Sequence, residues 1–101
     1  MKTVIYGVLK EEKSRNLEMQ EMYEKELESL RKGSVGERKV ANNTYYYLKY
    51  REGNKIITEY LGKDKEKAER VNYETARRKY IKSVLKRLKL EYKQICKIVK
   101  E

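Results

Sequence analysis

The chain has 101 residues, of which 26 are Lys or Arg and 16 are Asp or Glu, so its formal net charge is +10. A chain of this length buries only about 60 to 68% of the surface that it exposes when unfolded, which predicts one domain, residues 1–101, with a thin core. His is absent and Cys96 is the only cysteine, which excludes Ser/His/Asp and Cys/His catalytic sites, an internal disulfide and a cysteine-based zinc site. We therefore expect a protein that is not an enzyme and that needs no metal or cofactor.

The composition also bears on location and partners. No apolar run approaches the roughly 20 residues of a membrane span, and the first residues lack a signal-peptide pattern, so a cytoplasmic protein is expected. The positive charge favours polyanionic partners, first DNA or RNA and then acidic proteins. The alternative is that the charge serves solubility alone. Cys96 is expected to be a small buried hydrophobic residue.

Residues 1–32 predict a helix. The polar stretch from Lys10 to Asn16 leaves open whether this helix is continuous or broken, with Ser14 as the N-cap of a second piece. Gly33 marks the end of the helix, because it follows the cationic Arg31 and Lys32. The apolar positions that fall near one side of the helix are Ile5, Leu9, Leu17, Tyr23, Leu27 and Leu30.

From Ser34 to Gly62 the pattern changes to that of β-strands. Tight-turn dipeptides, Asn42-Asn43 and Gly53-Asn54, separate three short runs, which predicts a three-stranded antiparallel β-meander. The runs are Val35 to Val40, Thr44 to Arg51 and Lys55 to Leu61. Because side chains alternate along a strand, the middle run has an apolar face and an aromatic, cationic face, which are Tyr46, Leu48 and Tyr50 against Tyr45, Tyr47, Lys49 and Arg51.

Asp64 to Lys100 predicts one long helix, because the segment has neither Gly nor Pro and is rich in strong helix formers. Spacings of three and four residues draw an apolar stripe along it, made of Ile81, Val84, Leu88, Tyr92, Ile95 and Val99. The same spacings draw a second line of side chains, here called the lysine stripe, made of Lys82, Lys86, Lys89, Lys93, Lys97 and Lys100. From Lys65 onward 13 basic and 5 acidic residues give a net charge of +8, which is most of the excess charge of the chain.

The charges of the two helices are complementary, because acids are frequent in the second half of the first helix. We therefore predict an α+β fold in which the long basic C-terminal helix packs antiparallel on the N-terminal helix. The apolar stripe continues to the end of the chain, beyond the reach of the sheet. This favours a homodimer or a larger coiled-coil assembly, whose contact would use Leu88, Tyr92, Ile95 and Val99.

Two surfaces are candidates for binding nucleic acid. Cations that recur along a helix suit a series of phosphate contacts, and the alternative is a solvated helix face. Tyrosines on a sheet suit either base stacking or packing under a helix. The run from Gly33 to Lys39 is only superficially like a phosphate-binding loop, because it precedes a strand and lacks the Gly-Lys-Ser or Gly-Lys-Thr ending. The candidate residues are Arg38, Lys39, Tyr45, Tyr47, Lys49, Arg51, Arg78, Lys82, Lys86, Lys89, Lys93 and Lys97.

The middle of the chain contains, in order, Leu30-Arg31-Lys32-Gly33-Ser34-Val35, Tyr45-Tyr46-Tyr47-Leu48, Tyr50-Arg51-Glu52-Gly53 and Tyr60-Leu61-Gly62. This order resembles the DUF6788 family of small bacterial and archaeal proteins, a resemblance that implies no particular activity. Residues 33–69 are also similar, more weakly, to the arm-type DNA-binding domain of tyrosine recombinases, whose sheet enters the major groove. That similarity implies DNA contacts by residues of the sheet, although the long helix at each end is foreign to that module.

Three hypotheses of function follow. The first is a nucleic-acid-binding accessory protein from a phage or mobile element, which uses the basic helix for backbone contacts and the sheet for groove or base contacts. The second is a protein-binding module, such as an anti-defence inhibitor of a host nucleic-acid-processing protein. The third is a structural coiled-coil dimer without a ligand.

Overall fold

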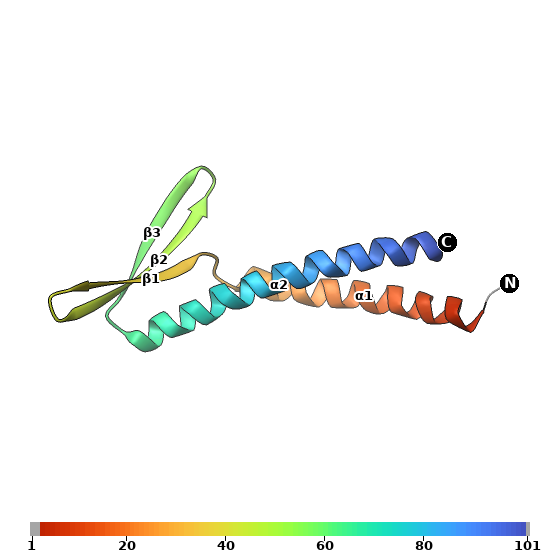
Figure 1. The fold of residues 1–101 in the computed structure, drawn as a ribbon, viewed down its shortest axis with the longest axis horizontal. Helices are drawn as coiled ribbons and strands as arrows, with labels where there is room; N and C mark the ends of the chain where they lie inside the picture. Colours follow the sequence, from red (N-terminus) through yellow and green to blue (C-terminus); the bar gives the residue numbers. More distant parts are fainter. Residues whose placement is uncertain (1–2, 101) are drawn as a thin grey trace. The chain divides into compact units, whose positions relative to one another are not determined.

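The computed structural model describes residues 3–100 and has the predicted α+β order (Figure 1). Its elements are α1 (Val4–Ser29), β1 (Ser34–Val40), β2 (Asn43–Glu52), β3 (Lys55–Gly62) and α2 (Lys65–Ile98). The chain divides into two compact units, of which one combines α1 with α2 from Ile81 onward and the other spans Leu30–Tyr80. Among the described helices, none is long and apolar enough to cross a membrane.

In the first unit, α1 and the second half of α2 form an antiparallel helical hairpin, as predicted. The side chain of Ile81 is completely buried, and Leu85, Leu88 and Val99 are buried with it. Asn16 is also buried; its Nδ2 donates a hydrogen bond to the backbone oxygen of Leu88 at 3.0 Å. Gln20 Nε2 donates to Asn16 Oδ1 at 2.6 Å. A hydrogen-bonded polar pair therefore lies within the helix contact.

The inward face of α1 agrees only in part with the predicted one: Leu9, Tyr23 and Leu27 are half-buried on it as predicted. The helix is continuous from Val4 to Ser29, so of the two alternatives left open by the sequence the unbroken helix is the one found. Ile5 and Leu17 are 72% and 45% exposed, so the prediction that they lie on the apolar side of the helix was wrong. The residues of the inward face recur every three or four positions, as in an antiparallel coiled coil, and they are Tyr6, Leu9, Lys13, Asn16, Gln20, Tyr23 and Leu27.

The second unit is built on the predicted meander, with strand order β1-β2-β3. Two-residue turns join the strands: Gly53-Asn54 as predicted, and Ala41-Asn42, one residue before the predicted Asn42-Asn43, because Asn43 already pairs with Val40. The left-handed conformation occurs at Ala41 and at Gly53. A register shift between Tyr46 and Tyr47 places Tyr60 opposite Tyr47. Such a bulge re-aims the side chains that follow it.

The first turns of α2 cover one face of this sheet. Leu48 and Leu61 form a buried cluster with Val71 of α2, and the partly buried Tyr46 and Tyr50 pack against this cluster, as the predicted apolar face requires. Asp64 caps the helix, because its Oδ1 accepts a hydrogen bond from the backbone N–H of Glu66 at 3.0 Å. The opposite face of the sheet is called the open face below.

Candidate nucleic-acid interface

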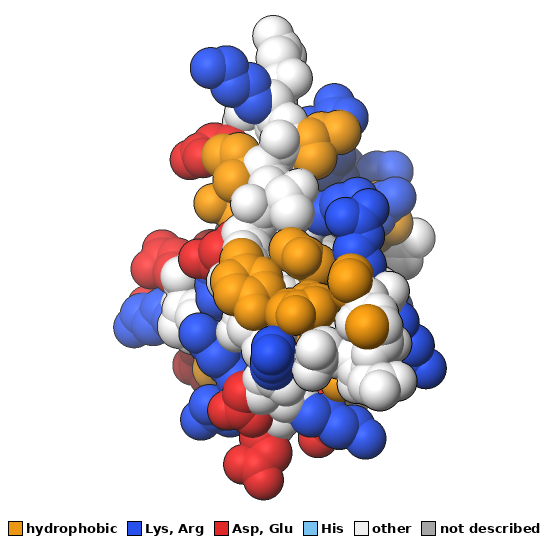
Figure 2. All heavy atoms as spheres, turned by 90° about the vertical axis from the view of Figure 1, so that its left-hand side faces the viewer, with side chains coloured by type: hydrophobic (Ala, Val, Ile, Leu, Met, Phe, Trp, Pro, Cys, Tyr) orange, Lys and Arg blue, Asp and Glu red, His pale blue; other side chains and the backbone are white. Residues whose placement is uncertain are grey.

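The open face is defined by strand alternation and register. Each pair across the sheet presents its side chains on the same side, and the pairs Arg38 with Tyr45 and Lys49 with Thr58 show how the three strands meet there. The open face consists of Ser34, Gly36, Arg38, Val40, Asn43, Tyr45, Tyr47, Lys49, Arg51, Ile56, Thr58 and Tyr60. Figure 2, which views the molecule from the side of the sheet, shows hydrophobic side chains gathered in a patch with Lys and Arg side chains beside it.

Three tyrosines form a cluster on the open face. The ring of Tyr60 lies 5.5 Å from that of Tyr47 and 6.3 Å from that of Tyr45, with tilts of 52° and 42°. Lys63 Nζ lies 5.3 Å from the centre of the Tyr45 ring, a cation–π distance. Tyr60 remains 55% exposed. The rings therefore support one another, and Tyr60 presents the most accessible aromatic surface of the cluster.

The cations of the sheet lie on both of its faces, whereas its acids lie on one face only. Arg38, Lys49 and Arg51 lie on the open face. The acids of the strands fall on the other face by the same alternation, and they are Glu37, Glu52 and Glu59. The carboxylate of Glu59 is paired with Arg31. Among the strand residues, all of which the structure describes, the open face thus carries cations and no carboxylate, which makes its potential positive.

A depression lies on the open face beside the tyrosine cluster. It has a volume of about 430 Å³ and is lined by Ser34, Val35, Gly36, Glu37, Arg38, Tyr47, Lys49 and Thr58. Gly36 faces Tyr47 across the β1–β2 pair, and it contributes no side chain. The side chains of Val35 and Glu37 belong to the covered face, so these residues line the depression through the strand itself.

The structure brings together five of the seven predicted residues of the second unit, namely Arg38, Tyr45, Tyr47, Lys49 and Arg51. Lys39 pairs with Thr44 and belongs to the covered face. Arg78 donates a hydrogen bond to the backbone oxygen of Leu30 at 3.3 Å and is half-buried, so it connects α2 to the segment before β1.

Sequence reasoning left Tyr60, Thr58 and Lys63 out of the predicted site. Alternation along β3 could have placed Thr58 and Tyr60 on the face of Lys49, but only if the register between β3 and β2 had been known. Lys63 lies in the connection between β3 and α2, where no periodicity applies.

The lysine stripe lies in the first unit, and all six of its side chains are exposed. An acid of α1 lies beside it. Lys89 Nζ lies 3.6 Å from Glu24 Oε1, and Glu21, one turn before Glu24, pairs with Lys25 at 3.6 Å. The predicted charge complementarity between the helices is therefore present, and it reduces the positive potential near Lys89.

The residues predicted to form an oligomer contact are used within the protomer. Leu88 and Val99 are buried in the hairpin, and Tyr92 and Ile95 are half-buried. Cys96 is half-buried as well, and its hydrogen bond with Tyr92 raises the pKa of the tyrosine, with burial adding to the effect. Assembly through this stripe stays a prediction, and it would have to share the stripe with α1.

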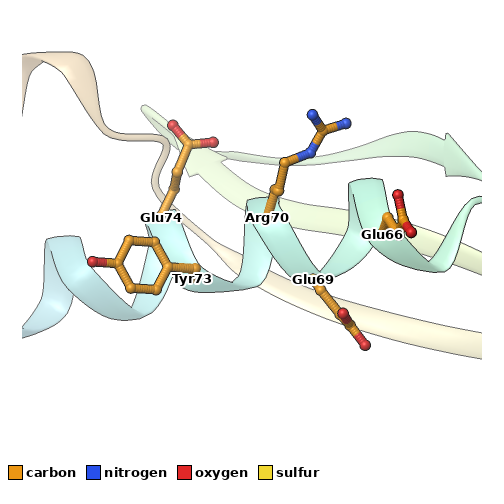
Figure 3. A pocket seen from close by; sticks show the side chains of 5 residues that line it. All are labelled: Glu66, Glu69, Arg70, Tyr73 and Glu74. Atoms are coloured by element: carbon orange, nitrogen blue, oxygen red, sulfur yellow. The ribbon is translucent and has the colours of Figure 1, made fainter.

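The beginning of α2 offers a second hollow, lined by Glu66, Glu69, Arg70, Tyr73 and Glu74. All five residues come from one helix, and the side chain of Glu69 points away from those of Arg70 and Glu74 (Figure 3). Within residues 3–100, no group of three His, Cys, Asp or Glu side chains could hold a metal ion. This acidic helix surface has neither convergent groups nor the charge for a polyanion.

Comparison with known proteins identifies one family. Residues 9–70 match the family described as a domain of unknown function, DUF6788. No curated protein and no solved structure matches the chain, and the similarity to arm-type DNA-binding domains gains no support. Because the match covers more than half of the 101 residues, the chain belongs to the DUF6788 family.

Proposed function

We propose that the protein is a non-enzymatic nucleic-acid-binding accessory protein of a phage or mobile element, and that it binds mainly through the open face of its sheet. The observation that carries this proposal is that the acids of the strands all lie on the covered face of the sheet, which leaves the cations of the open face without a carboxylate beside them on that face. Arg38, Lys49 and Arg51 share the open face with the tyrosine cluster, and the acids of the strands lie on the face that α2 covers.

The chemistry of the open face suits a nucleic acid better than other polyanions. Lys and Arg bind backbone phosphates and release condensed counterions, which supplies sequence-independent affinity. Tyrosines and arginines add contacts to bases, either by stacking or through base edges. Tyr60, which is 55% exposed, offers an accessible ring on which a base can stack.

The lysine stripe contributes a second, weaker surface in this proposal. Its exposed cations attract phosphates without reading sequence, and Glu24 lowers the contribution of Lys89. The protein acts in the cytoplasm, where nucleic acid is accessible to it. A homodimer would double the number of binding faces and raise the avidity.

A pair of charge-matched variants tests the open face. The first variant carries Lys49→Gln and Arg51→Gln, and the second carries Lys39→Gln and Lys55→Gln on the covered face of the same sheet. Both lower the net charge by two, so they change long-range attraction equally. Affinity for duplex DNA and for structured RNA is measured by fluorescence anisotropy over a range of salt concentrations.

We expect the open-face variant to lose about 1.8 units of the slope of log affinity against log salt, at about 0.9 per phosphate contact on B-DNA. The covered-face variant should lose far less, because its lysines contact no phosphate and so release no condensed counterions. Equal losses in the two variants would refute the open face as the binding surface. If the unmodified protein binds neither DNA nor RNA, the proposal fails and the protein-binding inhibitor becomes the better hypothesis.

A further inference from the structure

The backbone conformation of the sheet does not require a glycine at Gly36. It lies inside β1, and its φ is outside the left-handed region that favours glycine. A Cβ built on it would meet no atom within 4 Å. Glycine weakens a strand interior and often marks a place where a ligand or another backbone approaches closely. The space beside Gly36 is therefore open, as a close approach by a ligand requires.

The missing side chain creates the depression of the open face, and the groups around it suit an anion. Arg38 and Lys49 supply cationic donors, and Ser34 and Thr58 supply hydroxyl donors. A third cation reaches the rim from α2, because Lys79 Nζ lies 3.3 Å from Ser34 Oγ. Cationic and hydroxyl donors around one hollow match the oxygens of a tetrahedral phosphate.

We propose that this depression seats one backbone phosphate of the bound nucleic acid. The inference rests on the proposed function and specifies how that ligand is held: the phosphate enters the strand surface at Gly36, between Arg38 and Lys49. The seat differs from a phosphate-binding loop, because its backbone is an extended strand and its donors are side chains, with no helix N-terminus involved.

Gly36→Val tests the seat by filling it. Valine favours strands and has room here, so the fold should be retained or strengthened. Duplex affinity should fall at least about tenfold, as expected for the loss of a charge-assisted contact, and the salt slope should fall by about 0.9. Gly7→Ala is the matched control, because a Cβ at Gly7 also meets no atom within 4 Å and the residue lies in α1.

A second variant and a second ligand separate this inference from the proposed function. Thr58→Val removes one hydroxyl of the seat without changing its size, and it should lower duplex affinity severalfold. Inorganic phosphate, followed by backbone amide NMR, should shift the signals of residues 34–38 in the unmodified protein and leave them unshifted in Gly36→Val.

Unchanged duplex affinity in Gly36→Val, or phosphate shifts that persist in it, would overturn the seat even if the Lys49 and Arg51 variant confirms the open face. Conversely, the variant with Lys49→Gln and Arg51→Gln could lose nucleic-acid binding while Gly36→Val keeps it. That result would support the proposed function and refute the phosphate seat. Absence of any nucleic-acid binding by the unmodified protein overturns both.

Discussion

Replacing Lys86, Lys89 and Lys93 by Gln removes three charges from the middle of the lysine stripe. All three side chains are exposed, and Gln has a helix propensity close to that of Lys. The hairpin should therefore keep its fold, because its contact depends on Leu85, Leu88 and other buried residues on another side of α2. The change isolates the contribution of the stripe to polyanion binding.

The structure sets the expected magnitude. If each exposed lysine contacts a phosphate, the salt slope changes by about 0.9 per lysine on B-DNA. Lys89 is already within 3.6 Å of the Glu24 carboxylate, so it releases less counterion than Lys86 or Lys93. The triple variant should lower the slope by about 2, with most of the loss coming from Lys86 and Lys93. Glu24→Gln should raise the slope by up to about 0.9, since it leaves Lys89 available for a phosphate.

The assay is a salt titration of binding to several duplexes of unrelated sequence, between about 50 and 200 mM salt. Affinity should fall equally for all of them, because phosphate contacts position the protein without specifying a sequence. Single variants Lys89→Gln and Lys93→Gln provide the internal comparison, and Lys93→Gln should have the larger effect. A triple variant that is folded by circular dichroism and has an unchanged slope would show that the stripe is only a solvated face.

Three further predictions concern stability. Gly33→Ala should lower the free energy of unfolding by more than about 1 kcal/mol, because Gly33 has a φ of 121° and a Cβ would lie 2.3 Å from the Lys49 oxygen; a urea midpoint equal to that of the unmodified protein would contradict this. Ile81→Ala should cost about 2 to 5 kcal/mol, since the side chain is completely buried, and a loss below about 1 kcal/mol would mean that the hairpin is loosely packed. The pKa of Tyr92 is raised in the folded protein. The contribution of this tyrosine to the free energy of unfolding is therefore fully present below pH 10 and is lost as pH rises through the raised pKa. Tyr92→Phe should remove this part of the pH dependence, so identical alkaline profiles for the two proteins would refute it.

The sheet could be predicted closely from the sequence because its signals are local. Turn dipeptides separate the strands, and the predicted strand ends lie within one residue of the observed ones. Alternation then assigned Leu48 to the covered face and Lys49 to the open face, as found. The depression at Gly36 could not be predicted, since it depends on which side chains β2 and β3 place around the glycine.

The inward face of α1 was predicted only in part, because part of its signal is not local. Leu9, Tyr23 and Leu27 were placed correctly. An apolar pattern pointed to Ile5 and Leu17, but the packed helix turns Asn16 and Gln20 toward α2 instead. Asn16 is tolerated there because both its amide nitrogen and its amide oxygen have partners, which removes most of the cost of burying it. Only the position of the Leu88 carbonyl on the neighbouring helix shows that such a partner exists.

The contrast between local signals in the sheet and non-local signals in the helices also explains why the lysine stripe, the clearest pattern in the sequence, is not the strongest candidate site. A helix packed against another brings foreign side chains beside every stripe, so the charge of the lysine stripe depends on acids that are about 65 residues earlier in the chain, as the pair of Lys89 with Glu24 shows. A sheet covered on one face presents only its own alternating residues on the other. The charge of the open face is therefore fixed by β1, β2 and β3 themselves, and the acids of the strands are removed to the covered side. Cations that keep their charge uncompensated in this way are the ones that gain most from a phosphate, which is why the open face, with fewer cations than the stripe, should dominate binding.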